Sequence, residues 1–150
     1  MRRAFVFGLL VWLAPALQAD DFRLTMDELS GWLDAYGEAW ETRDADAAVK
    51  IFADDATYRV TPYEKPHVGH SGIHEYWASV TANQRNVRFT HEALSVQGDI
   101  GIAHWSAEFD VAPEGIKIEL DGVFVLEFDS QGKCRSLLEW WHRSLRPPRF

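Results

Sequence analysis

Four polar side chains in this sequence are of types that move protons in enzymes: Tyr36, His91, His104 and Glu139. A tyrosine hydroxyl can polarise an oxygen atom, and an imidazole can accept or donate a proton near neutral pH. A buried carboxylate beside a neutral imidazole completes an acid–base pair, because each shifts the pKa of the other toward neutral pH. We expect the four side chains to converge on one cavity, where elimination or enolisation chemistry would be feasible.

The two histidines lie on strands that a two-residue turn, 98–99, joins into a hairpin. Such a turn pairs Gln97 with Ile100 and places His91 and His104 diagonally opposed on the same face of the sheet. The next loop, which follows Val111, decides which face is buried, and two lengths are open.

Four loop residues, 112–115, would bury Trp105 and Phe109 and turn His104 outward, whereas five loop residues would reverse this. The residues alone leave both registers open. With His104 inward, Trp105 and Phe109 would lie on the outer face and would indicate a homodimer interface.

The elements before these strands are predicted to be helical. Over 25–42, apolar and aromatic residues recur every three to four positions, which predicts an amphipathic helix that starts at Thr25, with Glu28 at the capping-box position. A second, shorter helix is expected after the turn at 44–46 and a third over 71–82, with a short strand over 58–61 and another within 62–72.

From Arg85 onward the pattern changes to four antiparallel strands, separated by turn residues at 98–99, 113–115 and 129–132. The even-numbered residues between Ile116 and Phe128 form the clearest buried face. Helices first and a long meander second predict an α+β domain.

Residues 36–58, YGEAWETRDADAAVKIFADDATY, resemble the first two helices and first strand of the nuclear transport factor 2-like superfamily, which includes the SnoaL-like domains. The pairs at 72–73 and 76–77 resemble its third helix, and 128–133 followed by 139–141 resemble its closing hairpin. The resemblance implies a cone-shaped fold, with three N-terminal helices packed on a curved antiparallel sheet around an apolar pocket. It also favours His104 inward and turns Leu137, Glu139 and Trp141 toward the pocket.

Two enzyme classes of this superfamily were compared residue by residue. Ketosteroid isomerases would place their oxyanion-hole tyrosine at Tyr36, but their general base would fall on Val60 or Thr61 and their second donor on Phe124, so that isomerisation lacks a base. Dehydratases of the scytalone type are a looser match.

The dehydratase comparison places two pocket histidines near His91 and His104 and a tyrosine near Tyr58, although Trp40 replaces a functional tyrosine. The resemblance therefore implies a pocket that binds a small, largely apolar ligand through Trp40, Tyr58, Phe124 and Trp141. The alternative is a lyase or isomerase that needs no cofactor and uses the histidine, glutamate and tyrosine cluster. Whether the protein is an enzyme remains open.

The ends and the overall charge indicate where such a protein works. Arg2 and Arg3 precede the apolar run 4–13 and small residues that end at Ala19, the order of a secretory signal, with a competing cleavage site at 14–16. We expect a signal peptide over 1–19, a mature domain over 20–150, and a secreted or periplasmic protein without a stable membrane anchor, since the apolar run is shorter than the roughly 20 residues of a membrane span.

Removing 1–19 leaves 13 basic residues against 23 acidic ones and takes the net charge from −8 to −10, which disfavours binding to nucleic acid. Cys134 is the single cysteine, so no intrachain disulfide is expected. His67, His70 and His74 with Glu75 are spread over a loop and a helix start, and we expect no metal site there.

Overall fold

The computed structural model describes residues 22–144. Along the chain the elements are α1 (Met26–Thr42), α2 (Ala45–Val49), β1 (Phe52–Arg59), β2 (His67–Val68), α3 (Gly69–Thr81), β3 (Gln84–Gln97), β4 (Ile100–Val111), β5 (Ile116–Phe128) and β6 (Cys134–Arg143). The predicted signal peptide, 1–19, lies outside the described residues, so export stays a prediction. Within 22–144, no helix is long and apolar enough to cross a membrane.

The start of α1 is defined by its own sequence. The Thr25 hydroxyl accepts a hydrogen bond from the Glu28 backbone N–H, and the Glu28 carboxylate accepts one from the Thr25 N–H at 2.8 Å, which confirms the predicted capping box. The helix ends at Arg43 in the left-handed conformation, and the Asp44 side chain caps α2. The apolar stripe of α1 is buried as predicted, with Tyr36 inside.

The sheet has six strands in the order β2-β1-β6-β5-β4-β3. β1 runs parallel to β6, whereas the other neighbouring strands are antiparallel. The sheet is therefore mixed, and the expectation of an antiparallel sheet was wrong at this one pairing. β1 also begins at Phe52, well before the strand predicted over 58–61, because Phe52 pairs with Cys134 of β6 and is buried in the core.

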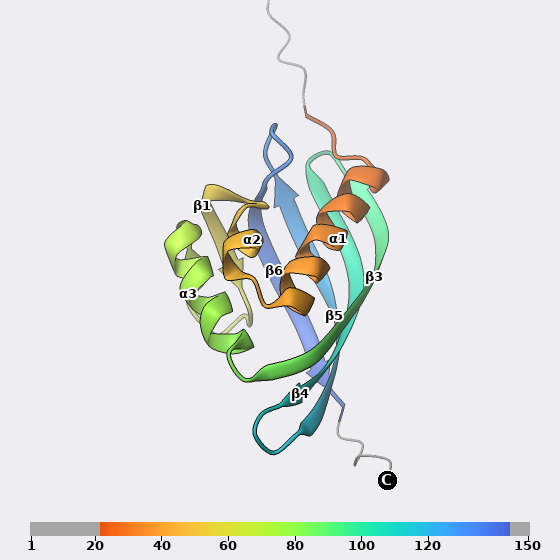
Figure 1. Ribbon diagram of the computed structural model, residues 1–150. Helices are drawn as coiled ribbons and strands as arrows, with labels where there is room; N and C mark the ends of the chain where they lie inside the picture. Colours follow the sequence, from red (N-terminus) through yellow and green to blue (C-terminus); the bar gives the residue numbers. More distant parts are fainter. Residues whose placement is uncertain (1–21, 145–150) are drawn as a thin grey trace, which may run out of the picture.

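The helices lie on one face of this curved sheet (Figure 1). α1 packs on β3, and α3 packs on β1 toward the other edge (Figure 1). The remaining face of β4, β5 and β6 carries exposed side chains such as Ile102 and Trp140. The sheet thus has an inner, helix-covered face and an outer face, and the parity of each strand residue decides which one it reaches.

The hairpin of β3 and β4 contains the irregularity that matters most for function. Gln97 pairs with Ile100 as predicted, but the register shifts between Ala93 and Ser95, and beyond that point Trp105 lies opposite His91. A β-bulge of one extra residue exchanges the two faces of a strand. The two histidines are therefore on opposite faces, and the predicted shared face was wrong.

The loop between β4 and β5 has four residues, 112–115, and Val111 pairs with Ile116 across it. This is the shorter of the two alternatives, and it buries Trp105 and Phe109. The favoured inward placement of His104 was wrong for the same reason. Because the two aromatic residues lie inside, they no longer support a homodimer interface, and a homodimer stays a prediction.

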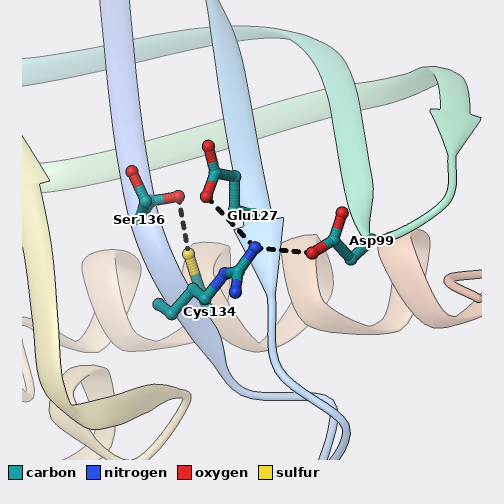
Figure 2. Close-up of polar contacts among 5 residues, drawn as sticks. Asp99, Glu127, Cys134 and Ser136 are labelled. Carbon is teal, nitrogen blue, oxygen red and sulfur yellow. Dashed lines mark hydrogen bonds and ion pairs between the residues drawn. The ribbon is translucent and has the colours of Figure 1, made fainter. Parts of the chain in front are cut away.

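Polar contacts connect β6 with β5 and with the turn between β3 and β4, and Figure 2 shows this end of the sheet in close-up. Arg135 of β6 reaches Asp99 in the β3–β4 turn at 2.5 Å and Glu127 of β5 at 3.4 Å. Beside it, the buried Cys134 thiol donates to the Ser136 carbonyl at 3.3 Å, and burial raises the pKa of this thiol (Figure 2). A protonated, enclosed thiol at this position is structural.

Candidate functional site: an aromatic cavity around Glu139

A cavity of about 180 Å³ lies between the helices and the inner face of the sheet. Seven aromatic residues from five elements line it: Tyr36, Trp40, Tyr58, Tyr76, Trp77, Trp105 and Trp141. The rest of the lining consists of Val60, Val80, Thr81, Gln84, Leu120 and Glu139. The volume is close to the roughly 150 Å³ of an apolar protein cavity that accepts benzene. A ligand of about that size would be surrounded by aromatic rings and one carboxyl group.

Glu139 is placed in this cavity by the alternation of β6. Leu137, Glu139 and Trp141 face inward as expected, and Phe124 of β5 is the cross-strand partner of Glu139. Only 5% of Glu139 is exposed. This burial raises the pKa of its carboxyl to about 8, although a hydrogen bond from Tyr58 acts in the opposite direction. In the empty cavity the group is therefore mostly protonated at neutral pH.

Two tyrosine hydroxyls extend the polar part of the cavity. Tyr36 Oη of α1 lies 2.7 Å from Tyr58 Oη of β1. When Glu139 is ionised, the Tyr58 hydroxyl donates to its carboxylate and the Tyr36 hydroxyl donates to Tyr58, because each hydroxyl has one proton. Burial, and then the Glu139 charge, raises the pKa of both tyrosines. Of these three groups, Glu139 is the one that can exchange a proton near neutral pH.

Tryptophan side chains form the part of the cavity wall away from the two tyrosine hydroxyls. Trp40 Nε1 donates to Gln84 Oε1 at 2.7 Å, and this bond fixes two lining residues from α1 and β3. Among the described residues, the buried indole N–H groups of Trp77 and Trp105 find no acceptor. The rings of Trp40 and Trp105 are 5.8 Å apart, so they form a continuous aromatic wall.

The structure brings together only two of the four predicted catalytic residues. Tyr36 and Glu139 line the cavity, but His91 and His104 do not. His104 Nε2 lies 3.0 Å from Asp121 Oδ2 on the outer face of the sheet. The expected convergence was therefore wrong for both histidines, and the His104–Glu139 acid–base pair does not form.

His91 lies on the inner face but beyond the cavity. Its Nε2 atom is 2.9 Å from Asp34 Oδ1 of α1, in a shallow groove between α1 and β3. Phe89 lies between this groove and the aromatic wall, with its ring 5.9 Å from the His91 ring and 6.2 Å from Trp105. The imidazole thus joins a helix to the sheet rather than facing a ligand in the cavity.

Three of the four predicted binding residues line the cavity: Trp40, Tyr58 and Trp141. Phe124 does not, because it is fully buried behind Trp105, with the two rings stacked at 5.0 Å. Sequence reasoning missed eight lining residues as ligand contacts: Val60, Tyr76, Trp77, Val80, Thr81, Gln84, Trp105 and Leu120. Tyr76 and Trp77 were assigned only to the third helix, Trp105 was inward only in the less favoured register, and Gln84 had no sequence signal.

The three histidines between residues 67 and 74 each have a separate contact. His67 stacks on Tyr76 with ring centroids 4.4 Å apart, His70 Nε2 lies 3.0 Å from a backbone carbonyl of β1, and His74 pairs with Asp46 at 3.1 Å. In the part of the chain that the structure describes, no three metal-ligating side chains come together. These histidines therefore join α3 to β2, β1 and α2.

Solved structures of other proteins share this architecture. The epoxide hydrolase/cyclase-like enzyme SalBIII, described in pyran ring formation in the polyether salinomycin, matches with a TM-score of 0.67 at 22% identity, over 79% of this chain and 95% of that one. A protein with a ketosteroid isomerase-like fold from Catenulispora acidiphila, in complex with trimethylamine, matches with a TM-score of 0.65 at 19% identity, over 73% and 83%.

A ketosteroid isomerase-like protein from Erwinia carotovora atroseptica matches with a TM-score of 0.61 at 16% identity, over 76% of this chain and 93% of that one. At such identities these likenesses establish the fold alone. No curated protein matches the sequence. The SnoaL-like domain family, by contrast, matches residues 33–137, which run from within α1 to within β6 and include Tyr36. The chain therefore belongs to the SnoaL-like domain family, within the nuclear transport factor 2-like superfamily.

Proposed function

We propose that the aromatic cavity binds a small, largely apolar ligand whose polar group lies against Glu139. The observation that carries this proposal is the composition of the cavity wall, which has seven aromatic side chains and a single carboxyl among its thirteen lining residues. Ligand sites are typically apolar cavities with a few polar groups that set orientation. The bound trimethylamine of the Catenulispora protein supports small-ligand binding by this fold.

A second candidate function is acid–base chemistry without a cofactor, as in a lyase, isomerase or cyclase. It is favoured by the pKa of about 8 of the Glu139 carboxyl, which lets this group donate a proton to a ligand oxygen and later take one back. Tyr58 would hold the carboxylate between the two steps. The cyclase-like description of SalBIII is in keeping with such chemistry.

Binding is tested by a thermal-shift and calorimetric screen of compounds with about six to ten non-hydrogen atoms, both neutral and charged, together with native mass spectrometry of the purified protein. We expect binders whose affinity falls in Trp141→Ala and is unchanged in Trp140→Ala, since the second tryptophan lies on the outer face. If no compound binds, or if both variants lose affinity equally, the cavity is not a ligand site.

Catalysis is tested with the binders that the screen finds. Glu139→Gln should keep the binding of a neutral ligand and remove its turnover, because glutamine fills the same space without an exchangeable acidic proton. Turnover that survives in this variant would exclude Glu139 as the acid or base.

Export is proposed from the sequence alone. Intact-mass measurement of the protein recovered outside the cytoplasm should show a chain that begins at or near Asp20. A recovered chain that still carries residues 1–19 would contradict the predicted cleavage.

A further inference from the structure

We propose that the ligand of this cavity carries a small organic ammonium group, held by the aromatic rings and by the Glu139 carboxylate. The inference rests on the proposed function, because it assigns a ligand class to the same cavity. It selects among three classes of polar group that could lie against Glu139: an anion, a neutral hydrogen-bonding group and a cation.

The charge of the cavity wall disfavours an anionic ligand. Among residues 22–144, those that line the cavity include no lysine, arginine or histidine. A carboxylate or phosphate ligand would therefore meet Glu139 without any compensating positive charge from the described wall, which disfavours anions. The whole chain has a formal net charge of −8, which raises the local concentration of cations and lowers that of anions.

The Glu139 carboxyl has no cationic partner among residues 22–144. Buried carboxylates in proteins are normally paired with a cation or satisfied by several donors. Within residues 22–144, no ion pair involves Glu139, and its side-chain hydrogen bond is with Tyr58 alone. An ammonium ligand would supply the positive charge that the fold leaves out.

The aromatic rings of the cavity are arranged in a way that favours a cation. Tyr36 lies 5.1 Å from Trp77 and 6.2 Å from Trp40, measured between ring centroids, and both contacts are edge-on, at 80° and 89°. Tyr58 lies 5.1 Å from Tyr76. The rings thus line several sides of one small space. An ammonium group within about 6 Å of such ring faces is attracted by their quadrupoles, most strongly where water is excluded.

The groups that face Glu139 define how binding depends on pH. They are Tyr36 from α1, Tyr58 from β1 and Tyr76 from α3, together with Phe124 of β5, which does not titrate. Burial raises the pKa of each tyrosine, so all three hydroxyls stay protonated. Glu139 is then the one facing group that changes charge between about pH 5 and pH 9.

The sign of that dependence separates the two remaining ligand classes. An ammonium ligand requires the carboxylate, so its binding releases one proton, and its affinity rises about tenfold per pH unit up to the Glu139 pKa of about 8 and then levels off. A neutral ligand that accepts a hydrogen bond from the protonated carboxyl shows the reverse, with an affinity that falls above pH 8.

Choline and its uncharged isostere 3,3-dimethylbutan-1-ol are matched probes, because they differ in charge and hardly in shape. Calorimetric titrations at about pH 6, 7 and 8, each in two buffers of different ionisation enthalpy, give the affinity and the protons released. We expect choline to bind at least tenfold more tightly than the isostere at pH 8, to gain about tenfold between pH 6 and 7, and to release one proton. Glu139→Gln should reduce choline to the level of the isostere and remove its pH dependence.

Equal or tighter binding of the isostere, or choline affinity that falls with rising pH, would overturn the ammonium assignment. If neither probe binds but neutral compounds of the screen do, the assignment fails and the proposed function stands. If nothing binds, both fail. Should Glu139→Gln not fold, the probe pair and the pH series on the unaltered protein still decide, and Trp140→Ala serves as a folded control outside the cavity.

Discussion

The two faces of the sheet carry acidic groups in opposite situations. On the inner face, Glu139 is 5% exposed, its side chain has one hydrogen-bond partner within residues 22–144, the tyrosine Tyr58, and burial raises its pKa to about 8. On the outer face, Asp121 of the neighbouring strand pairs with His104, and the side chains are 69% and 42% exposed. Water screens the outer pair, whereas the inner carboxyl has exchanged water for aromatic rings.

In this protein, the type of a residue was a poor guide to whether it has an altered pKa. His104 and Asp121 are of the residue types that form acid–base pairs, but exposure to solvent keeps their interaction weak. The lone glutamate gains an altered proton affinity from burial, which no neighbour in the sequence reveals. Four experiments test this contrast between the two faces.

The largest effect is expected from two adjacent residues of β5 that face opposite sides. Phe124 is fully buried, and Phe124→Ala should lower the free energy of unfolding by about 3–5 kcal/mol, because it leaves a cavity behind Trp105. Val123→Ala on the outer face should change it by less than about 1 kcal/mol. Urea unfolding of both variants measures this, and equal losses would contradict the assignment of faces.

The next effect is a pH dependence of stability that belongs to the inner carboxyl. The folded-state pKa of Glu139, about 8, lies above its ordinary value of 4.5, so the folded protein holds a proton that the unfolded chain releases. This contribution is complete below pH 4.5 and is lost as pH rises through 8, with a slope of at most about 1.4 kcal/mol per pH unit.

Unfolding free energies measured between about pH 5 and 8 test that slope. Glu139→Gln should flatten the profile, whereas Trp140→Ala, which changes the outer face without removing a titratable group, should leave it nearly unchanged. A profile with the same slope in all three proteins would mean that Glu139 is ionised in the folded state.

A smaller effect distinguishes the two neighbouring tryptophans of β6. Trp141 lines the cavity, whereas Trp140 is 49% exposed on the outer face. Trp141→Ala should weaken a cavity ligand about tenfold, or about 1.4 kcal/mol, and Trp140→Ala should leave its affinity unchanged. Calorimetry with one binder from the screen measures both, and the reverse order would place the ligand outside the cavity.

The smallest effect is expected at the outer pair. His104→Ala and Asp121→Ala should each lower the free energy of unfolding by less than about 1 kcal/mol, and the effect should shrink further in high salt. A double-mutant cycle isolates the pairwise contribution. A coupling well above this range would show that the outer pair is shielded from water, as it would be in a homodimer that covers this face.

Local patterns were sufficient for much of the fold. The capping box at Thr25, the buried stripe that carries Tyr36, the hairpin turn after Gln97 and the alternation around Glu139 follow from spacing over a few residues. Only the family resemblance turned the Glu139 side of that alternation inward. The local features are predictable because capping, helical periodicity and strand parity act between near neighbours. The family resemblance rested on the same local features.

By itself, then, the sequence determined an α+β SnoaL-like domain with Tyr36 and Glu139 in its pocket, whereas the tertiary structure decided which other side chains join them. The four-residue loop after Val111 turned His104 out and Trp105 in, and the register shift after Ala93 placed His91 on the opposite face from His104. A one-residue bulge leaves no local signal, because long-range packing of the hairpin selects it, and yet it exchanges the faces of every residue that follows. The raised pKa of Glu139 is likewise a property of the assembled wall, since burial arises only when α1, α3 and the sheet close around it.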